Sequence, residues 1–148
     1  MSDLDESIKT RFQNEKHRML VNIVFTSNWL RNKRSEFLKP YDLSFQQFNI
    51  LRILRGNGGW MTMNDVKSVM IDKAPHMTRM VTKLLDKGFV ERKPCLKDRR
   101  VTFIQISKPG LALLEELDQK TKDEMRMLDG ITLEEAKVVN SVLDRIRN

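Results

Sequence analysis

With 148 residues, 40% of them hydrophobic and 32% charged, the chain is expected to form a single globular domain of ordinary composition. No apolar run approaches the roughly 18 residues of a membrane span, the N-terminus lacks a signal-peptide pattern, and a single cysteine excludes an internal disulfide, so we expect a cytoplasmic protein without membrane contact. The formal net charge of +7 fits a nucleic-acid partner. An excess of basic over acidic residues alone, however, indicates no more than a well-solvated surface.

The first predicted element is a long helix. Residues from about Ser2 to Leu38 contain neither glycine nor proline, and Pro40 closes the stretch, which predicts one helix, straight or bent. The apolar residues near one of its faces are Ile8, Phe12, Met19, Ile23 and Leu30. Because so small a domain cannot bury such a stripe alone, we expect the early turns to pack on a partner chain.

A second helix is predicted to begin after Ser44, which stands at capping-box spacing from Gln47. Its core-facing residues are Phe48, Leu51 and Leu54. The residues Asn57-Gly58-Gly59 end this helix, and Trp60-Met61 is expected to form a short strand that pairs with a later hairpin.

The stretch from Thr62 to Ser107 organises the rest of the chain. Thr62 and Asp65 have the spacing of a capping box, and the short helix that they open carries an apolar stripe of Val66, Val69 and Met70. A further helix is predicted over residues 75–88, with Pro75 in its first turn and Gly88 at its end. Its inward positions are Met77, Met80, Val81 and Leu84. Its opposite, polar face carries His76, Thr78, Arg79, Thr82 and Lys83.

Two β-rich runs follow, at residues 89–93 and 101–106, joined by a basic loop. The charged residues of that loop are Lys97, Asp98, Arg99 and Arg100. A helix-turn-helix followed by a basic hairpin is the layout of a winged-helix DNA reader, in which one helix enters the major groove and the hairpin reaches a minor groove. Residues 62–107 hold 10 basic and 5 acidic groups, whereas residues 108–148 hold 7 and 9, so the positive charge is concentrated on this unit.

The C-terminal part of the chain predicts two more helices. Ser107 caps the first, which has Pro109 in its first turn. Its heptad-like seam runs through Leu114, Leu117, Thr121, Met125 and Leu128, and Gly130 ends it. Thr132 opens the last helix, whose apolar side is Ala136, Val139, Leu143 and Ile146. Apolar seams at both ends of the chain favour a homodimer, and a bundle within one chain is the alternative.

The loop Asp98-Arg99-Arg100 and the following Ile106-Ser107-Lys108-Pro109-Gly110 resemble the "DxR … LTxxG" signature of the MarR family of bacterial transcription regulators. Ile-Ser replaces Leu-Thr, and Val66 stands where the family usually has leucine. The resemblance covers nearly the whole chain. It implies a mainly α fold with a small β-hairpin wing: a single domain over residues 1–148, with a winged helix-turn-helix at about 44–107 and dimerisation helices at about 1–38 and 108–148.

Arg79 is the first candidate for a base contact, because arginine can grip O6 and N7 of guanine together. His76, Thr78 and Thr82 are candidates for lesser base or phosphate contacts, and Lys83 for a phosphate contact. Arg100 matches the arginine of the family motif, which implies insertion into a minor groove and a salt bridge from Asp98 that orients it. We expect Lys97 and Arg99 to meet phosphates. For each of these residues the alternative is a solvated charge.

The predicted function is that of a sequence-specific transcription regulator, a repressor in the first instance, that binds double-stranded DNA as a homodimer at a pseudo-palindromic operator. The rivals are a non-specific architectural DNA-binding protein and an interaction module that has lost DNA binding. The sequence has no phosphate loop, nucleophile elbow or metal-ligand spacing, and the acidic pair Glu115-Glu116 looks like a solvated face, so we expect no enzyme activity, metal or cofactor.

Aromatic residues gather around the junction of the first two predicted helices: Phe25, Trp29, Tyr41, Phe45 and Phe48. Members of the family resembled here often bind small aromatic effectors in the crevice between the dimer and DNA-binding regions, which makes these residues candidates for an effector site. Ordinary core packing is the alternative. Cys95 has basic neighbours and is a conceivable redox switch, but the family's peroxide sensors place their cysteine in the first helix, which here has none.

Overall fold

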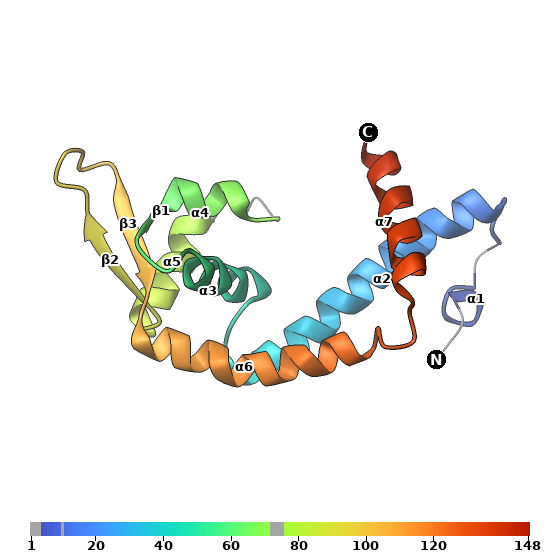
Figure 1. The fold of residues 1–148 in the computed structure, drawn as a ribbon, viewed down its shortest axis with the longest axis horizontal. Coiled ribbons are helices and arrows are strands. Elements are labelled where there is room, and N and C mark those ends of the chain that lie inside the picture. Colours follow the sequence, from blue (N-terminus) through green and yellow to red (C-terminus); the bar gives the residue numbers. More distant parts are fainter. Residues whose placement is uncertain (1–3, 10, 72–75) are drawn as a thin grey trace.

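The computed structural model describes residues 4–9, 11–71 and 76–148. The molecule is a crescent in which α6 runs along the outer edge and joins two ends (Figure 1). The elements are α1 (Leu4–Ser7), α2 (Glu15–Leu38), the short 3-10 helix η1 (Lys39–Tyr41), α3 (Phe45–Asn57), β1 (Met61–Thr62), α4 (Met63–Val69), α5 (Met77–Asp86), β2 (Val90–Pro94), β3 (Thr102–Ile106), α6 (Lys108–Arg126) and α7 (Leu133–Arg147).

One end of the crescent is a winged-helix lobe, made of α3, β1, α4, α5, β2 and β3 (Figure 1). Its antiparallel sheet has the order β1-β3-β2, with Met61 opposite Ile104 and Val90 opposite Ile106. The other end, the terminal lobe, consists of α1, α2 and α7. These observations confirm the predicted mainly helical fold with a small β-hairpin wing.

The hydrophobic core belongs to the winged-helix lobe. Its side chains that are fully buried are Leu38, Ile50, Leu51, Leu54, Val66, Leu84, Ile104, Leu114 and Leu117. Leu38 comes from the end of α2, and Leu114 and Leu117 come from the first half of α6, so α2 and α6 are both anchored in this core.

Side-chain caps begin most of the helices where the sequence predicts them. Capping boxes form at Ser44, Thr62 and Thr132, and the Ser107 hydroxyl accepts a hydrogen bond from the Gly110 amide at 3.2 Å. Gly110 lets α6 approach the start of the wing closely, because a Cβ there would lie 2.3 Å from the carbonyl oxygen of Phe89.

The prediction of one continuous first helix is wrong. α1 ends at Ser7 and α2 begins at Glu15, because Asn14 adopts an extended backbone (φ −167°) and its side chain caps the His17 amide at 3.0 Å. Asparagine is a strong N-cap residue, and this local signal interrupts a stretch that has no glycine or proline.

Smaller corrections concern the helix-turn-helix. Val69 is 58% exposed, in contrast to the prediction that it faces inward with Val66 and Met70; α4 ends at Val69, and Met70 reaches the core from an extended backbone. The predicted strand at Trp60-Met61 is shifted by one residue, to Met61–Thr62. The placement of Pro75 lies outside the described residues, and α5 begins at Met77. No helix of the described part of the chain has the length and apolar character to cross a bilayer.

Candidate nucleic-acid interface

Helix α5 is strongly amphipathic. Met77, Val81 and Leu84 are buried in the core, as predicted, and Met80 packs against it. On the opposite side every predicted contact residue is exposed: His76, Thr78, Arg79, Thr82 and Lys83. The Thr82 hydroxyl donates to the Thr78 carbonyl oxygen at 2.9 Å, which leaves its oxygen free to accept a further hydrogen bond.

The end of α5 is fixed to its surroundings at two places. Gly88 has a φ of +75°, which lets the chain turn sharply into β2 at no steric cost. Lys87 donates from Nζ to Asp42 Oδ2 at 2.7 Å, and this hydrogen-bonded charge lowers the pKa of the Asp42 carboxyl. Because Val81 and Leu84 of α5 share one core with Val90 and Ile104 of the wing strands, α5 and the wing form one body.

The wing carries its cations in a loop with a defined turn. Cys95 and Val101 pair across the loop, N to O at 3.0 Å, and the Val101 amide donates to the Asp98 carbonyl oxygen, also at 3.0 Å. Lys97, Arg99 and Arg100 are exposed. On β2, Lys93 Nζ lies 4.2 Å from the centre of the Trp60 ring, a cation–π contact that the sequence did not indicate.

The predicted salt bridge between Asp98 and Arg100 is wrong. Within the part of the chain that the structure describes, no ion pair joins these two side chains. Instead Asp98 Oδ1 accepts a hydrogen bond from the backbone amide of Arg100 at 2.9 Å. The aspartate therefore shapes the turn that presents Arg100, as Asx turns do, and leaves the guanidinium exposed.

Acidic residues of α6 hold the two lobes together by polar contacts that cross between helices. Arg55 of α3 pairs with both carboxylate oxygens of Asp118, at 2.7 and 3.1 Å. Arg34 of α2 pairs with Glu124 at 2.7 Å, and the Tyr41 hydroxyl donates to Glu116. Glu116 is exposed, as the sequence suggested, and this hydrogen bond gives it a partner on η1.

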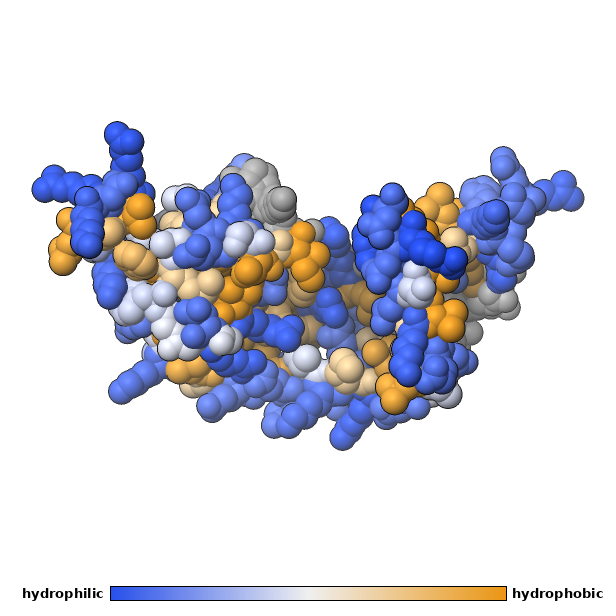
Figure 2. Space-filling view, turned by 45° about the horizontal axis from the view of Figure 1, so that its top comes forward, coloured by the Kyte–Doolittle hydropathy of each residue, from blue (hydrophilic) through white to orange (hydrophobic). Residues whose placement is uncertain are grey.

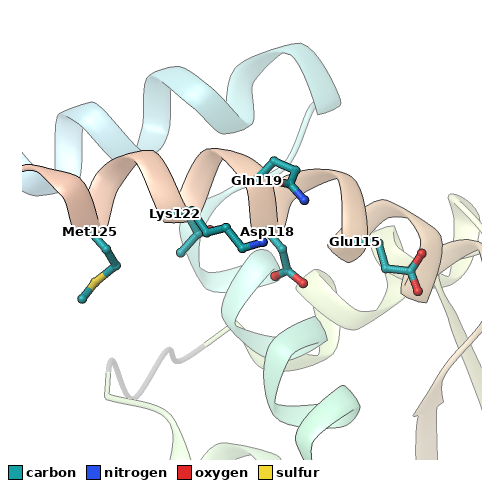
Figure 3. A pocket seen from close by; sticks show the side chains of 6 residues that line it. Glu115, Asp118, Gln119, Lys122 and Met125 are labelled. Carbon is teal, nitrogen blue, oxygen red and sulfur yellow. The ribbon is translucent and has the colours of Figure 1, made fainter.

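The hydrogen bonds from Arg55 lower the pKa of Asp118, and the same bonds raise the pKa of Arg55. Beside this pair, a cavity of about 400 Å³ opens along α6, lined by Glu115, Asp118, Gln119, Thr121, Lys122 and Met125 (Figure 3). Its lining combines both signs of charge. No group of His, Cys, Asp or Glu suited to a metal ion occurs among the described residues.

The candidate effector residues do not share one environment. Phe48 is 3% exposed and stacks edge-on against Phe37 in the core, whereas Trp29 is 47% exposed and lies under Lys33. Tyr41 and Phe45 are half-buried near the α2–α3 junction, each with a cation over its ring, and Phe25 is half-buried on α2. Their role in effector binding stays a prediction.

A larger apolar cavity, of about 550 Å³, lies between α2 and α7 and contains none of these five aromatic residues. Its lining is mainly aliphatic: Met19, Asn22, Ile23, Thr26, Ser27, Leu30, Val138, Val139, Val142 and Leu143.

Comparisons with known proteins agree with this geometry. A sequence model of the MarR family matches residues 43–102. The multiple antibiotic resistance protein MarR of Salmonella typhimurium is 27% identical over 114 residues, which cover 76% of this chain and 78% of that protein. The transcriptional repressor IacR of Pseudomonas putida is 28% identical over 108 residues, covering 72% and 64%.

Solved structures share the whole fold. A mutant MarR from Escherichia coli, complexed with operator DNA, has a TM-score of 0.70 and 25% identity, over 98% of this chain and 99% of that one. A putative MarR-like regulator from Bacillus cereus has a TM-score of 0.77 at 22% identity, covering 90% and 96%, which shows the fold alone. Together with the winged-helix lobe, these matches support a winged-helix transcription regulator of the MarR family.

Proposed function

We propose that this protein is a sequence-specific transcriptional repressor that binds a pseudo-palindromic operator as a homodimer. One observation carries the proposal: the polar face of α5 and the cations of the wing are exposed on one body, whose apolar side is locked into the core. A rigid body with a helix and a basic hairpin on its surface can place the helix in a major groove and the hairpin in an adjacent minor groove.

In this arrangement Arg79, in the first turn of α5, reads a guanine edge through a bidentate contact. His76, Thr78 and Thr82 lie on the same exposed face and add base or phosphate contacts. Lys83 lies one turn further along α5 and meets a phosphate, since a lysine beyond the base-reading turn is suited to the backbone.

In the wing, Arg100 enters the minor groove, where a narrow groove over A·T-rich DNA attracts arginine. Asp98 keeps the turn in shape through the Arg100 amide and does not neutralise the guanidinium. Lys97 and Arg99 are exposed on the same loop and bind flanking phosphates.

Dimerisation uses the terminal lobe, because that lobe exposes an apolar surface that a folded monomer would not keep in water. The exposed large apolar residues there include Met19, Leu20, Val24, Val138, Val139 and Ile146. Figure 2 shows apolar surface at this end of the molecule. A second copy offers the same surface, as a two-fold interface requires. This assigns residues 1–38 and 108–148 to the dimer and about 44–107 to DNA, within one domain.

The homologue named a transcriptional repressor and the MarR structure solved with operator DNA support repression at an operator. A dimer with two-fold symmetry presents two reading helices, which accounts for a pseudo-palindromic site with half-sites about one helical turn apart. Bound there, the protein blocks access to a promoter.

We also propose that a small aromatic molecule releases the operator by binding near Tyr41 and Phe45 at the α2–α3 junction. The support is local: both rings are half-buried, and Lys120, which lies 5.0 Å from the centre of the Tyr41 ring, offers a positive charge to an aromatic carboxylate. A panel of benzoates and phenols should raise the melting temperature and weaken operator binding. A panel without either effect would contradict the effector proposal and leave the repressor proposal standing.

The repressor proposal is tested by selecting genomic fragments that the intact protein retains, then comparing the selected duplex with a randomised one over a salt series. A repressor should prefer the selected duplex by a factor of about 10³ or more. Equal affinity for both duplexes would contradict it and favour a non-specific architectural role.

A further inference from the structure

Leu96, at the tip of the wing, is 100% exposed. Among the large apolar side chains of the described residues, only Ile71 comes near, at 91%, and Leu133 follows at 80%. A single exposed leucine is common on protein surfaces and needs no special role. The position of Leu96 is what distinguishes it, because it stands in the loop that faces DNA in the proposed function.

The loop holds this leucine outward. Cys95 and Val101 are bonded across the base of the loop at 3.0 Å, and Asp98 fixes the turn through the Arg100 amide at 2.9 Å. Leu96 therefore lies beyond the last paired residue of the hairpin and packs against no part of the described protein. Its apolar surface is available for burial in a partner, and such burial is favourable.

The charges around Leu96 identify the partner. Residues 92–100 contain five basic side chains and one acidic one, and the residues from Lys97 to Arg100 are all exposed. A partner that accepts an apolar tip between several cations must carry flanking negative charge and an apolar interior. The minor groove of DNA offers both, since phosphates line its edges and the apolar space between stacked base pairs opens from its floor.

We propose, building on the proposed DNA-binding function, that Leu96 inserts between two base pairs of the operator flank as an apolar wedge beside Arg100. Apolar side chains placed in minor grooves partly unstack a base step and kink the duplex toward the major groove. The wing then favours flexible pyrimidine–purine steps at the flank, so it discriminates sequence at a position where it makes no hydrogen bond to a base.

The test uses the selected operator with 2-aminopurine placed in turn at each step of the flank that footprinting assigns to the wing. Unstacking raises 2-aminopurine fluorescence. The wild-type protein should raise it at one step, Leu96→Met should retain the rise because its side chain is still apolar, and Leu96→Ala and Leu96→Gln should lose it. Leu96→Ala should also weaken operator binding about tenfold, with an unchanged melting temperature.

Val69→Ala is the matched control, because Val69 is also an exposed apolar residue, at 58%, but lies on α4 and not in the wing loop or the terminal lobe; it should leave the fluorescence rise and the operator affinity unchanged. An operator bound without any rise in fluorescence, or a rise that survives Leu96→Ala, would overturn the wedge. So would binding to anionic vesicles that depends on Leu96 in the absence of a fluorescence response. Equal affinity of the wild-type protein for the selected operator and a randomised duplex would instead contradict the proposed function, and the wedge proposal with it.

Discussion

The two ends of the crescent differ in how completely they are folded on their own. The winged-helix lobe surrounds a continuous core from Phe48 and Leu51 to Ile104. The terminal lobe contributes almost nothing to that core: α7 has no buried residue, and α2 buries only Leu38, where it meets the winged-helix lobe. The winged-helix lobe thus has a core of its own, whereas the terminal lobe leaves its apolar residues largely exposed.

In the proposed dimer, this difference indicates which part of each protomer supplies the free energy of association. Apolar residues that remain exposed in the monomer lose that exposure when two copies associate, so folding of the terminal lobe and dimerisation become one process. The winged-helix lobe, by contrast, has a buried core within one chain. The Arg55–Asp118 and Arg34–Glu124 pairs connect the two lobes through α6, so in the proposed dimer the interface sets the spacing of the two α5 helices.

The largest expected effect comes from placing a charge in the terminal lobe. Val139→Glu puts a carboxylate into the apolar cavity between α2 and α7, and burying an unpaired charge in an interface is costly. We expect monomers in sedimentation experiments at micromolar concentration and a loss of about 10²-fold or more in operator affinity, because the two half-sites no longer act together.

Val69→Glu is the control for this substitution, because Val69 has a similar exposure, 58% against 54% for Val139, but lies on α4 of the winged-helix lobe. It should sediment as a dimer. A Val139→Glu protein that stays dimeric would refute the assignment of the interface.

The second effect tests whether the buried core of the winged-helix lobe supplies the stability of the fold. Leu54→Ala removes a fully buried side chain and should lower the free energy of unfolding by about 2–5 kcal/mol, since a cavity remains. Leu133→Ala should change it by less than about 0.5 kcal/mol. Denaturant titration measures both, and similar losses in the two variants would contradict the contrast between the lobes.

The third effect separates the two kinds of DNA contact. Arg79→Ala should cost about 1–3 kcal/mol on the operator and flatten the preference at one base position in each half-site. Lys83→Ala should weaken all DNA alike and lower the salt slope by about one for each phosphate that the lysine no longer neutralises. Arg100→Ala should penalise A·T-rich flanks most. Equal losses by all three variants on operator and random duplexes would show that α5 does not read bases.

The smallest effect concerns the link between the lobes. Because Arg55 lowers the pKa of Asp118, the pair stabilises the fold above the usual pKa of aspartate, and this contribution is lost as the pH falls through the lowered pKa. The Asp118 side chain is 39% exposed, so solvent screening limits the effect of Asp118→Asn to about 1 kcal/mol or less at neutral pH.

Chemical unfolding from pH 7 down to about pH 2 tests this link, and the difference between Asp118→Asn and the wild type should shrink toward acid. Asp123→Asn removes an exposed pair within α6 and should change the stability little. A difference between Asp118→Asn and the wild type that does not depend on pH would contradict the electrostatic origin of the link.

Signals confined to a few neighbouring residues predicted the fold well. The capping boxes at Ser44, Thr62 and Thr132 begin helices in the structure as expected, because a cap needs only residues three apart. The same kind of signal at Asn14 was available, and it explains why the first predicted helix is broken. The two faces of α5 also follow from helical period alone.

Contacts between distant residues could not be predicted in the same way. The pairing of Arg55 with Asp118 joins residues 63 positions apart, and no local pattern selects one acidic partner among several on α6. The prediction for Asp98 was wrong for a different reason. An aspartate side chain can accept a hydrogen bond from a backbone amide two residues further on as readily as from a guanidinium, and the residue types alone do not distinguish the two contacts.

The most direct test of the central claim is the mass of the complex on operator duplexes that carry both half-sites or only one. Native mass spectrometry, with affinities measured in parallel, should find two protomers on the full operator and binding weaker by about 10²-fold or more on the half-site duplex. Val139→Glu should bind the two duplexes alike. One protomer on the full operator, or equal affinity of the wild type for both duplexes, would contradict the account.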